Sequence, residues 1–133
     1  MNPAGDPARD AARAIGFTIL AAGVAVWWAL ILHVPVTRPW FFPDGVMEHA
    51  FRSFVMPDLL ILSLGSAIAA WRLWTGRPAV AAAWFTAGAT CYAALYTIGW
   101  SRHEDVPLAS PLLMAAAAAL ALICARRPVS RSR

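Results

Sequence analysis

Long apolar runs separated by short polar segments dominate the chain, and four of these runs reach the length of a membrane-spanning helix: residues 14–35, 54–74, 79–100 and 106–125. A helix needs about 20 residues to cross roughly 30 Å of hydrocarbon. Helices also satisfy their own backbone polar groups in lipid, and the alternating ten-residue segments of a membrane β-barrel are absent. The pattern therefore predicts an all-α membrane protein, a four-transmembrane-helix bundle forming a single domain over residues 14–125.

The composition agrees with this prediction. Of the 133 residues, 60% are hydrophobic and 14% are charged, whereas about 25% are charged in a typical soluble domain. A soluble chain of this length could not bury so much apolar surface in one small core, which excludes a soluble enzyme. Cys91 and Cys124 are predicted at depths too different for a disulfide. Glycine-rich phosphate loops, serine triads and metal-ligand spacings are absent, so we expect no cofactor and no metal ion.

The arginines are unevenly distributed between the predicted loops and tails. Three lie in the first and third loops, and eight lie on the other side, in the two tails and the second loop: Arg9, Arg13, Arg72, Arg77, Arg126, Arg127, Arg131 and Arg133. The positive-inside rule then places both termini in the cytoplasm. We expect a disordered tail at residues 1–13 and a basic tail at 126–133. The first run is too long for a cleaved signal peptide, and no small-residue cleavage site follows it.

The net charge of +4 comes mostly from the basic C-terminal tail. We interpret it as contact with lipid headgroups and not as a nucleic-acid surface. All 11 basic residues are arginine, which is typical of a GC-rich genome. We therefore expect a multi-pass protein of a bacterial inner (cytoplasmic) membrane.

Asp58 is the most informative residue, because it interrupts the second apolar run. It lies 14 residues before Arg72, or about 21 Å of helix, which places it roughly 10 Å inside the outer edge of the hydrocarbon. An acid there usually faces a cavity or a partner. It is either a proton donor or hydrogen-bond anchor in a pocket, or a structural carboxyl satisfied by a neighbouring helix. His33, at the outer end of the first run, either partners Asp58 or bonds a backbone carbonyl.

An aromatic row follows the third run at intervals of four residues: Trp84, Gly88, Tyr92, Tyr96 and Trp100. Such a row stays on one side of a helix with a slow drift. Packing is one explanation for it, and the wall of a binding site is the other. Aromatic faces stabilise cations. An acid beside such a wall suits a cationic amine ligand, or a carbocation in an alkene isomerisation or cyclisation.

The first outer loop carries further polar candidates. Asp44 can cap a helix that begins at Gly45 and continues through Glu48 and His49. We take Glu48 as a candidate catalytic residue that tunes Asp58, although a surface ion pair with Arg52, four residues later, also explains it. Asp44 and His49 are candidate ligand-binding residues.

Three short segments resemble one family of membrane proteins. They are His33-Val34-Pro35-Val36-Thr37, Phe51-Arg52-Ser53-Phe54 leading to Asp58, and Arg77-Pro78-Ala79. With four predicted spans and an acid early in the second, the chain resembles the EXPERA superfamily, which holds emopamil-binding sterol isomerases and sterol-binding receptors.

The resemblance implies a four-helix bundle whose ligand cavity is closed from the cytoplasm and entered from lipid. It implies that Asp58 meets a hydroxyl or amine of the ligand, and that Asp44 stands near the acid that follows the first span, at a different spacing. The isomerases carry a histidine one turn before the second-span acid, and Phe54 occupies that position here. The resemblance therefore does not carry sterol isomerisation over to this chain.

The sequence leaves three classes of function open. The first is a membrane-embedded binding protein, or an isomerase or cyclase using acid–base chemistry on an alkene, for a sterol-like or isoprenoid lipid. The second is a proton or small-cation transporter or channel component with Asp58 as relay, although transporters need polar access from both sides. The third is a structural or assembly subunit. The small residues of the fourth run allow close helix approach, to a partner or in a homodimer.

Overall fold

The computed structural model describes residues 7–42, 48–103 and 107–126, with the side chains of 48–52 outside the description. Every element in these ranges is helical. The elements are α1 (Pro7–His33), the 3-10 helix η1 (Pro35–Trp40), α2 (Glu48–Pro57), the π-helix η2 (Asp58–Ser63), α3 (Leu64–Trp74), α4 (Val80–His103) and α5 (Ala109–Ala125). The prediction of an all-helical chain is confirmed for the described residues.

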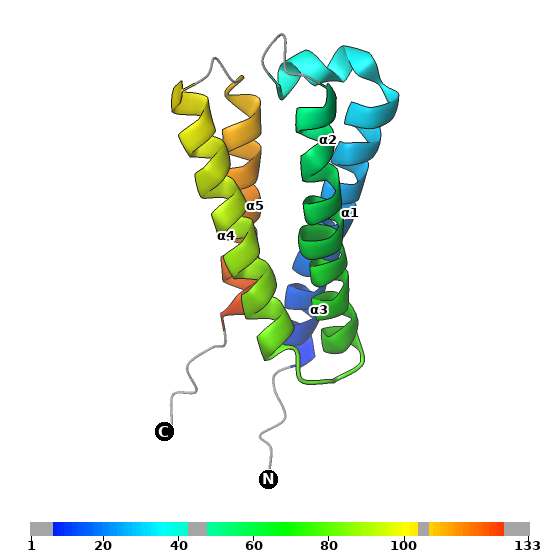
Figure 1. The fold of residues 1–133 in the computed structure, drawn as a ribbon. Helices are drawn as coiled ribbons and strands as arrows, with labels where there is room; N and C mark the ends of the chain where they lie inside the picture. The colour runs from blue at the N-terminus through cyan, green and yellow to red at the C-terminus, as the bar shows by residue number, and fades with distance from the viewer. Residues whose placement is uncertain (1–6, 43–47, 104–106, 127–133) are drawn as a thin grey trace.

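The elements form four long rods, because α2, η2 and α3 follow one another as a single rod (Figure 1). The start of α1, the α3–α4 turn and the end of α5 lie at one end of the molecule, which we call the base. The opposite end, with η1 and the end of α4, is the rim. The most extensive contacts join α4 to α5 and α1 to α3. The molecule is therefore two helix pairs that diverge from the base toward the rim (Figure 1).

The first helix begins earlier than the sequence pattern predicts. We expected a disordered tail over residues 1–13, but residues 7–13 are the first two turns of α1. Pro7 suits the first turn of a helix. Arg13 then ties this segment to the fold, since its Nε donates to the carbonyl oxygen of Cys124 at 2.7 Å and its Nη1 pairs with Asp10 at 2.9 Å. Residues 1–6 and 127–133 lie outside the described residues.

Within the part of the chain that the structure describes, two helical segments are long and apolar enough to cross a membrane, namely Pro7–His33 and Ser53–Trp74. Only 28% and 22% of their most apolar windows are buried inside the protein, whereas the core helix of a soluble protein is mostly buried. The 17-residue α5 is apolar but shorter. The tyrosine, threonine, tryptophan and glycine residues of α4 lower its hydropathy. The four apolar runs of the sequence thus correspond to four rods. Two of these rods contain a helix that is both long enough and apolar enough to cross a membrane.

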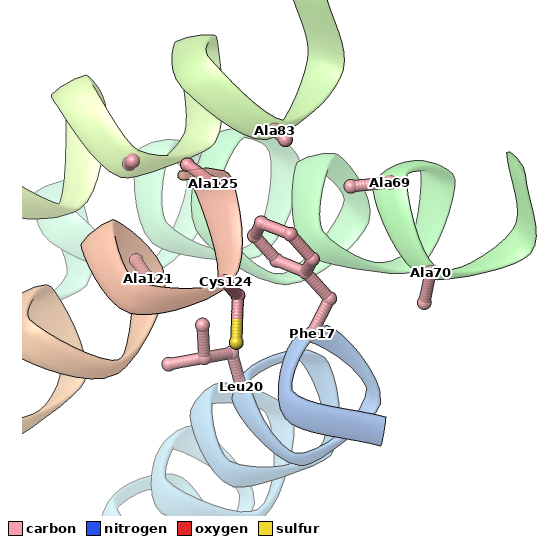
Figure 2. Packing of buried hydrophobic residues seen from close by; sticks show 9 residues of the cluster. Phe17, Leu20, Ala69, Ala70, Ala83, Ala121, Cys124 and Ala125 are labelled. Carbon is pink, nitrogen blue, oxygen red and sulfur yellow. The ribbon is translucent and has the colours of Figure 1, made fainter. Parts of the chain in front are cut away.

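Small side chains fill the core at the base. Phe17 of α1 is fully buried there among alanines of α3, α4 and α5 (Figure 2). The backbones come so close that a Cβ atom on Gly16 would collide with Sγ of Cys124. Similarly, a Cβ atom on Gly65 would lie 2.8 Å from Oγ1 of Thr86. Small residues allow this close approach of helices, and the base is accordingly the tightly packed end of the molecule.

Large aromatic side chains replace these small ones toward the rim. Trp28, Ile31 and Phe42 form the buried centre of that cluster. The chain seals the end of α1 there, because the hydroxyl of Thr37 donates to the carbonyl oxygen of Val34 at 2.8 Å and Nε of Arg38 donates to that of Ile31 at 2.9 Å. These bonds satisfy carbonyls that the helix itself leaves without partners. They also hold η1 against α1, next to the cavity described below.

Candidate functional site

A cavity of about 500 Å³ lies between the two helix pairs. Ligand sites commonly have volumes of roughly 300–1,000 Å³ and mostly apolar walls. Every rod contributes to this wall, which comprises Trp27, Trp28, Phe42, Phe54, Pro57, Asp58, Ile61, Leu62, Phe85, Ala89, Tyr92, Ala93, Tyr96, Thr97, Trp100, Ser110 and Met114. Among the described residues, a single carboxyl group, that of Asp58, stands in this largely apolar lining.

The irregular part of the second rod carries Asp58 into the cavity wall. Pro57 has no backbone N–H and therefore cannot continue the ordinary pattern of helical hydrogen bonds. The π-helix η2 begins at the next residue, Asp58, and ends at Ser63. Wide helical turns of this kind are rare and occur often at functional sites. The hydroxyl of Ser63 fixes the far end of η2, since it donates to the carbonyl oxygen of Ala21 in α1 at 2.8 Å.

Trp28 is the partner of Asp58. Its indole Nε1 donates a hydrogen bond of 3.0 Å to Oδ2 of Asp58, and its side chain is only 1% exposed. Asp58 makes no ion pair within the described part of the chain. One carboxyl oxygen is thus held by a neutral donor, and the carboxyl group has no cation beside it in that part.

Trp28 does not stand out in the sequence, because the Trp27–Trp28 pair lies within an apolar run. The signal in the sequence that could have identified Trp28 is its predicted depth in the membrane. Trp28 lies five residues before His33, which is about 7.5 Å deeper along the helix and closer to the depth predicted for Asp58. Only the packing of α1 against η2 shows which of the two adjacent tryptophans faces the acid.

Aromatic rings line the rim side of the cavity. Phe54 lies 5.6 Å from Tyr96 and 6.3 Å from Trp100 between ring centroids. Phe42 lies 6.3 Å from Trp28 and 6.1 Å from Trp100. Rings at these separations attract one another beyond simple burial. They form a connected aromatic group from three of the four rods and the turn after η1, which we call the ring cluster: Trp28, Phe42, Phe54, Tyr96 and Trp100.

The aromatic row of α4 is divided by the structure. Tyr92, Tyr96 and Trp100 line the cavity, whereas Trp84 does not. A spacing of four residues drifts by about 40° around a helix at each step. Trp84 is three such steps from Tyr96, which lies near the middle of the α4 lining, so its side chain is turned roughly 120° away from that lining. The expectation that Trp84 belongs to the wall is corrected accordingly.

The structure does not bring His33 to Asp58. His33 is exposed at the last residue of α1 and does not line the cavity. It lies five residues after Trp28, so it projects roughly 140° around the helix from the side chain that does meet the acid. Asp44 lies outside the described residues. Glu48 and His49 begin α2, but their side chains also lie outside the description, so their predicted roles stay predictions.

The chemistry of the cavity follows from its few polar groups. The hydroxyl of Thr97 is already used, because it donates to the carbonyl oxygen of Ala93 at 2.8 Å. Within the described residues there is no cluster of side chains that could hold a metal ion. Asp58 therefore offers the strongest hydrogen-bond acceptor in an apolar space, which suits a hydrophobic molecule that carries one hydrogen-bond donor or one positive charge.

Comparisons of the chain with known protein families, with curated proteins and with solved structures find no match. The likeness to the EXPERA superfamily therefore stays a prediction, and functional inference depends on the geometry of the cavity.

Proposed function

We propose that this protein is a membrane-embedded binding protein for a hydrophobic small molecule or lipid of the sterol-like or isoprenoid kind. The observation that carries the proposal is the position of Asp58. Its carboxyl group opens on an apolar, aromatic-lined cavity of about 500 Å³ and is held by Trp28, with no ion-pair partner in the described residues. Asp58 is half-buried; a polar group withdrawn from water without enough partners is costly, and a ligand donor would supply the missing interaction.

A bilayer location is supported by the surfaces of the helices. Large apolar side chains face outward along all four rods, for example Ile19 of α1, Leu64 of α3, Leu95 of α4 and Ile123 of α5, each at least half exposed. Monomeric soluble proteins rarely expose apolar surface of this extent. We propose that all four rods span the membrane and surround the cavity as a bundle.

The proposed orientation places the base in the cytoplasm. Arg9, Arg13, Arg72, Arg77 and Arg126 all lie at or near the base end of their helices. Arg77 also covers the ring of Trp71 at 4.6 Å, a pairing typical of a membrane interface. The cavity then lies toward the outer leaflet, in a multi-pass protein of the bacterial inner membrane.

Binding is better supported than catalysis. An alkene isomerisation moves a proton to one carbon and removes one from another. Asp58 is the only carboxyl group in the described lining, and the described lining has no histidine. The isomerase or cyclase therefore remains an extension of the binding proposal.

The tight apolar packing of the base argues against the alternative that the protein is a transporter. A transport path needs polar access from both sides, but Phe17, Ala69, Ala83 and Ala121 are fully buried between the cavity and the basic end. We therefore place the ligand in a site that opens away from the base.

Native mass spectrometry with lipid analysis of gently purified protein tests the proposal. We expect a discrete bound lipid or terpenoid in the wild type and its loss in Asp58→Leu, which removes the acceptor but keeps a similar side-chain volume. Asp10→Leu is the matched control, because Asp10 pairs with Arg13 at the base and is far from the cavity lining. If Asp58→Leu is folded and retains the same adduct as the wild type, Asp58 is structural and the proposal fails.

A further inference from the structure

The wall of the cavity differs in character on the two sides of Asp58. On its own rod, Phe54 precedes Asp58 by four residues and Leu62 follows it by four, and all three line the cavity. Toward the rim the wall is the ring cluster. Toward the base the lining is mostly aliphatic or small, namely Ile61, Leu62, Ala89, Ala93 and Met114, and the exposed rings of Tyr92 and Phe85 stand at its edge on α4. The acid therefore stands at a junction between an aromatic part, the ring cluster, and a mostly aliphatic part of one cavity.

The two parts suit different pieces of a molecule. Planar rings of a ligand gain from edge and offset contacts with aromatic side chains, which the ring cluster offers. Beside alanines, a flexible hydrocarbon chain can follow the helix surface. The lining of α4 runs from Phe85 to Trp100, or about 22 Å of helix. The cavity is thus long enough to hold a ring together with a chain.

The hydrogen bond that Asp58 can offer determines where along the ligand its hydrogen-bond donor must lie. Trp28 already occupies Oδ2 of Asp58, so the second carboxyl oxygen is the acceptor that remains for a ligand. Because Asp58 lies between the two parts, the donor must lie in the middle of the ligand and not at its end.

We propose that the ligand is a flat hydroxylated ring joined to a single hydrocarbon tail, with the hydroxyl group next to the point of attachment. The ring lies in the ring cluster, the hydroxyl donates to Asp58, and the tail runs toward the base past Leu62 and Ala89. A prenylated phenol has this arrangement, whereas a sterol carries its hydroxyl at the far end of a rigid ring system. This inference rests on the proposed function and names the chemical class for the same site.

Four synthetic probes test separately the hydroxyl donor, its position next to the tail and the flatness of the ring. They are ortho-geranylphenol, its methyl ether, para-geranylphenol, and the cyclohexanol that carries the same ortho tail. Calorimetric titration into the full-length protein in lipid nanodiscs, with empty nanodiscs as blank, measures their affinities. We expect the ortho phenol to bind most tightly. The methyl ether should bind about tenfold more weakly or worse, because it has no donor for Asp58. The para phenol and the saturated ring should lose several-fold each.

Matched variants show whether the probe occupies this cavity. Trp100→Leu removes a ring of the cluster and should weaken the ortho phenol several-fold while leaving the saturated-ring probe nearly unchanged. Trp84→Leu is the same substitution on the same helix outside the cavity lining and should leave both affinities as they are. Asp58→Leu should remove the difference between the phenol and its methyl ether.

Two results overturn the inference, and they differ in what they say about the proposed function. If cholesterol binds with Asp58-dependent affinity while the ortho phenol binds no better than its methyl ether, the class of ligand is wrong and the binding function stands. If all four phenol-series probes bind equally, cholesterol is insensitive to Asp58→Leu and no adduct is purified, the inference and the proposed function fail together.

Discussion

The base and the rim of this molecule are built from the same four rods but pack in opposite ways. At the base, glycine, alanine and cysteine allow the helix backbones to touch around the single large ring of Phe17. Toward the rim, tryptophan, phenylalanine and tyrosine hold the rods apart around the cavity. Side-chain volume decides this difference, because helices separate by as much as their interface side chains require. We therefore expect the packing at the base to contribute most to the stability of the fold, whereas the candidate binding site lies toward the rim.

Enlarging an alanine tests this contrast most directly. Ala83 is fully buried at the base, and Ala89 lines the cavity on the same helix. Ala83→Phe should lower the free energy of unfolding by about 3 kcal/mol or more, because no space receives the ring. Ala89→Phe should leave the fold intact and abolish ligand binding by filling the cavity. Thermal unfolding in detergent and the adduct measurement check the pair, and equal destabilisation by both would remove the distinction between the two regions.

The adjacent tryptophans sharpen the contrast within the cavity wall. Trp28→Phe removes the bond to Asp58 and should cost about 1–3 kcal/mol, with weaker ligand binding. The indole nitrogen of Trp27 is buried and has no hydrogen-bond partner in the described residues. Trp27→Phe should therefore cost clearly less. Chemical unfolding of the two variants measures the loss in free energy of unfolding for each. A similar loss for both would argue that Trp28 contributes through its volume alone.

A pair of glycines in α1 gives a smaller effect. An added methyl group at Gly16 meets Sγ of Cys124, whereas one at Gly23 meets nothing within 4 Å. Gly16→Ala should cost about 1 kcal/mol, since crowding outweighs the gain in helix propensity. Gly23→Ala should stabilise by up to about 1 kcal/mol. In the double variant Gly16→Ala, Cys124→Ala, the midpoint of thermal unfolding should recover. A Gly16→Ala protein as stable as Gly23→Ala would mean that the base is loosely packed.

The smallest expected effect concerns the bond that joins η2 to α1. Ser63→Ala removes the bond to the carbonyl oxygen of Ala21 and should cost about 0.6 kcal/mol, the usual value for a bond between membrane helices. Ser101→Ala removes only a local bond to Ile98 in an exposed position and serves as the control. A measurably larger loss in Ser63→Ala than in Ser101→Ala, in the same unfolding assay, is the expected result.

Much of the fold follows from the apolar runs, because a long run without charge has few alternatives to a helix. Asp58 could be singled out for the same reason, since an acid in such a run is conspicuous. Its partner could not, because Trp28 and His33 are both plausible until the rotation of α1 is known. The spacing of Trp84 was misleading for a related reason: a row of four-residue steps turns steadily around the helix, and nothing in the sequence says where it leaves the cavity.

The divergence of the two helix pairs also has a mechanical consequence. α4 contains 24 residues, or about 36 Å of helix, and the contacts that Ala83 and Ala87 make hold its lower end in the base core. Together with α5, which packs along it, α4 is therefore a lever with a short arm fixed in the base and a long arm that reaches toward the rim. From Ala87 to His103 the long arm measures about 24 Å, so a tilt of about 5° at the pivot moves the far end by about 2 Å. A small change in the alanine packing at the base would therefore appear as a larger change in the width of the cavity at the rim.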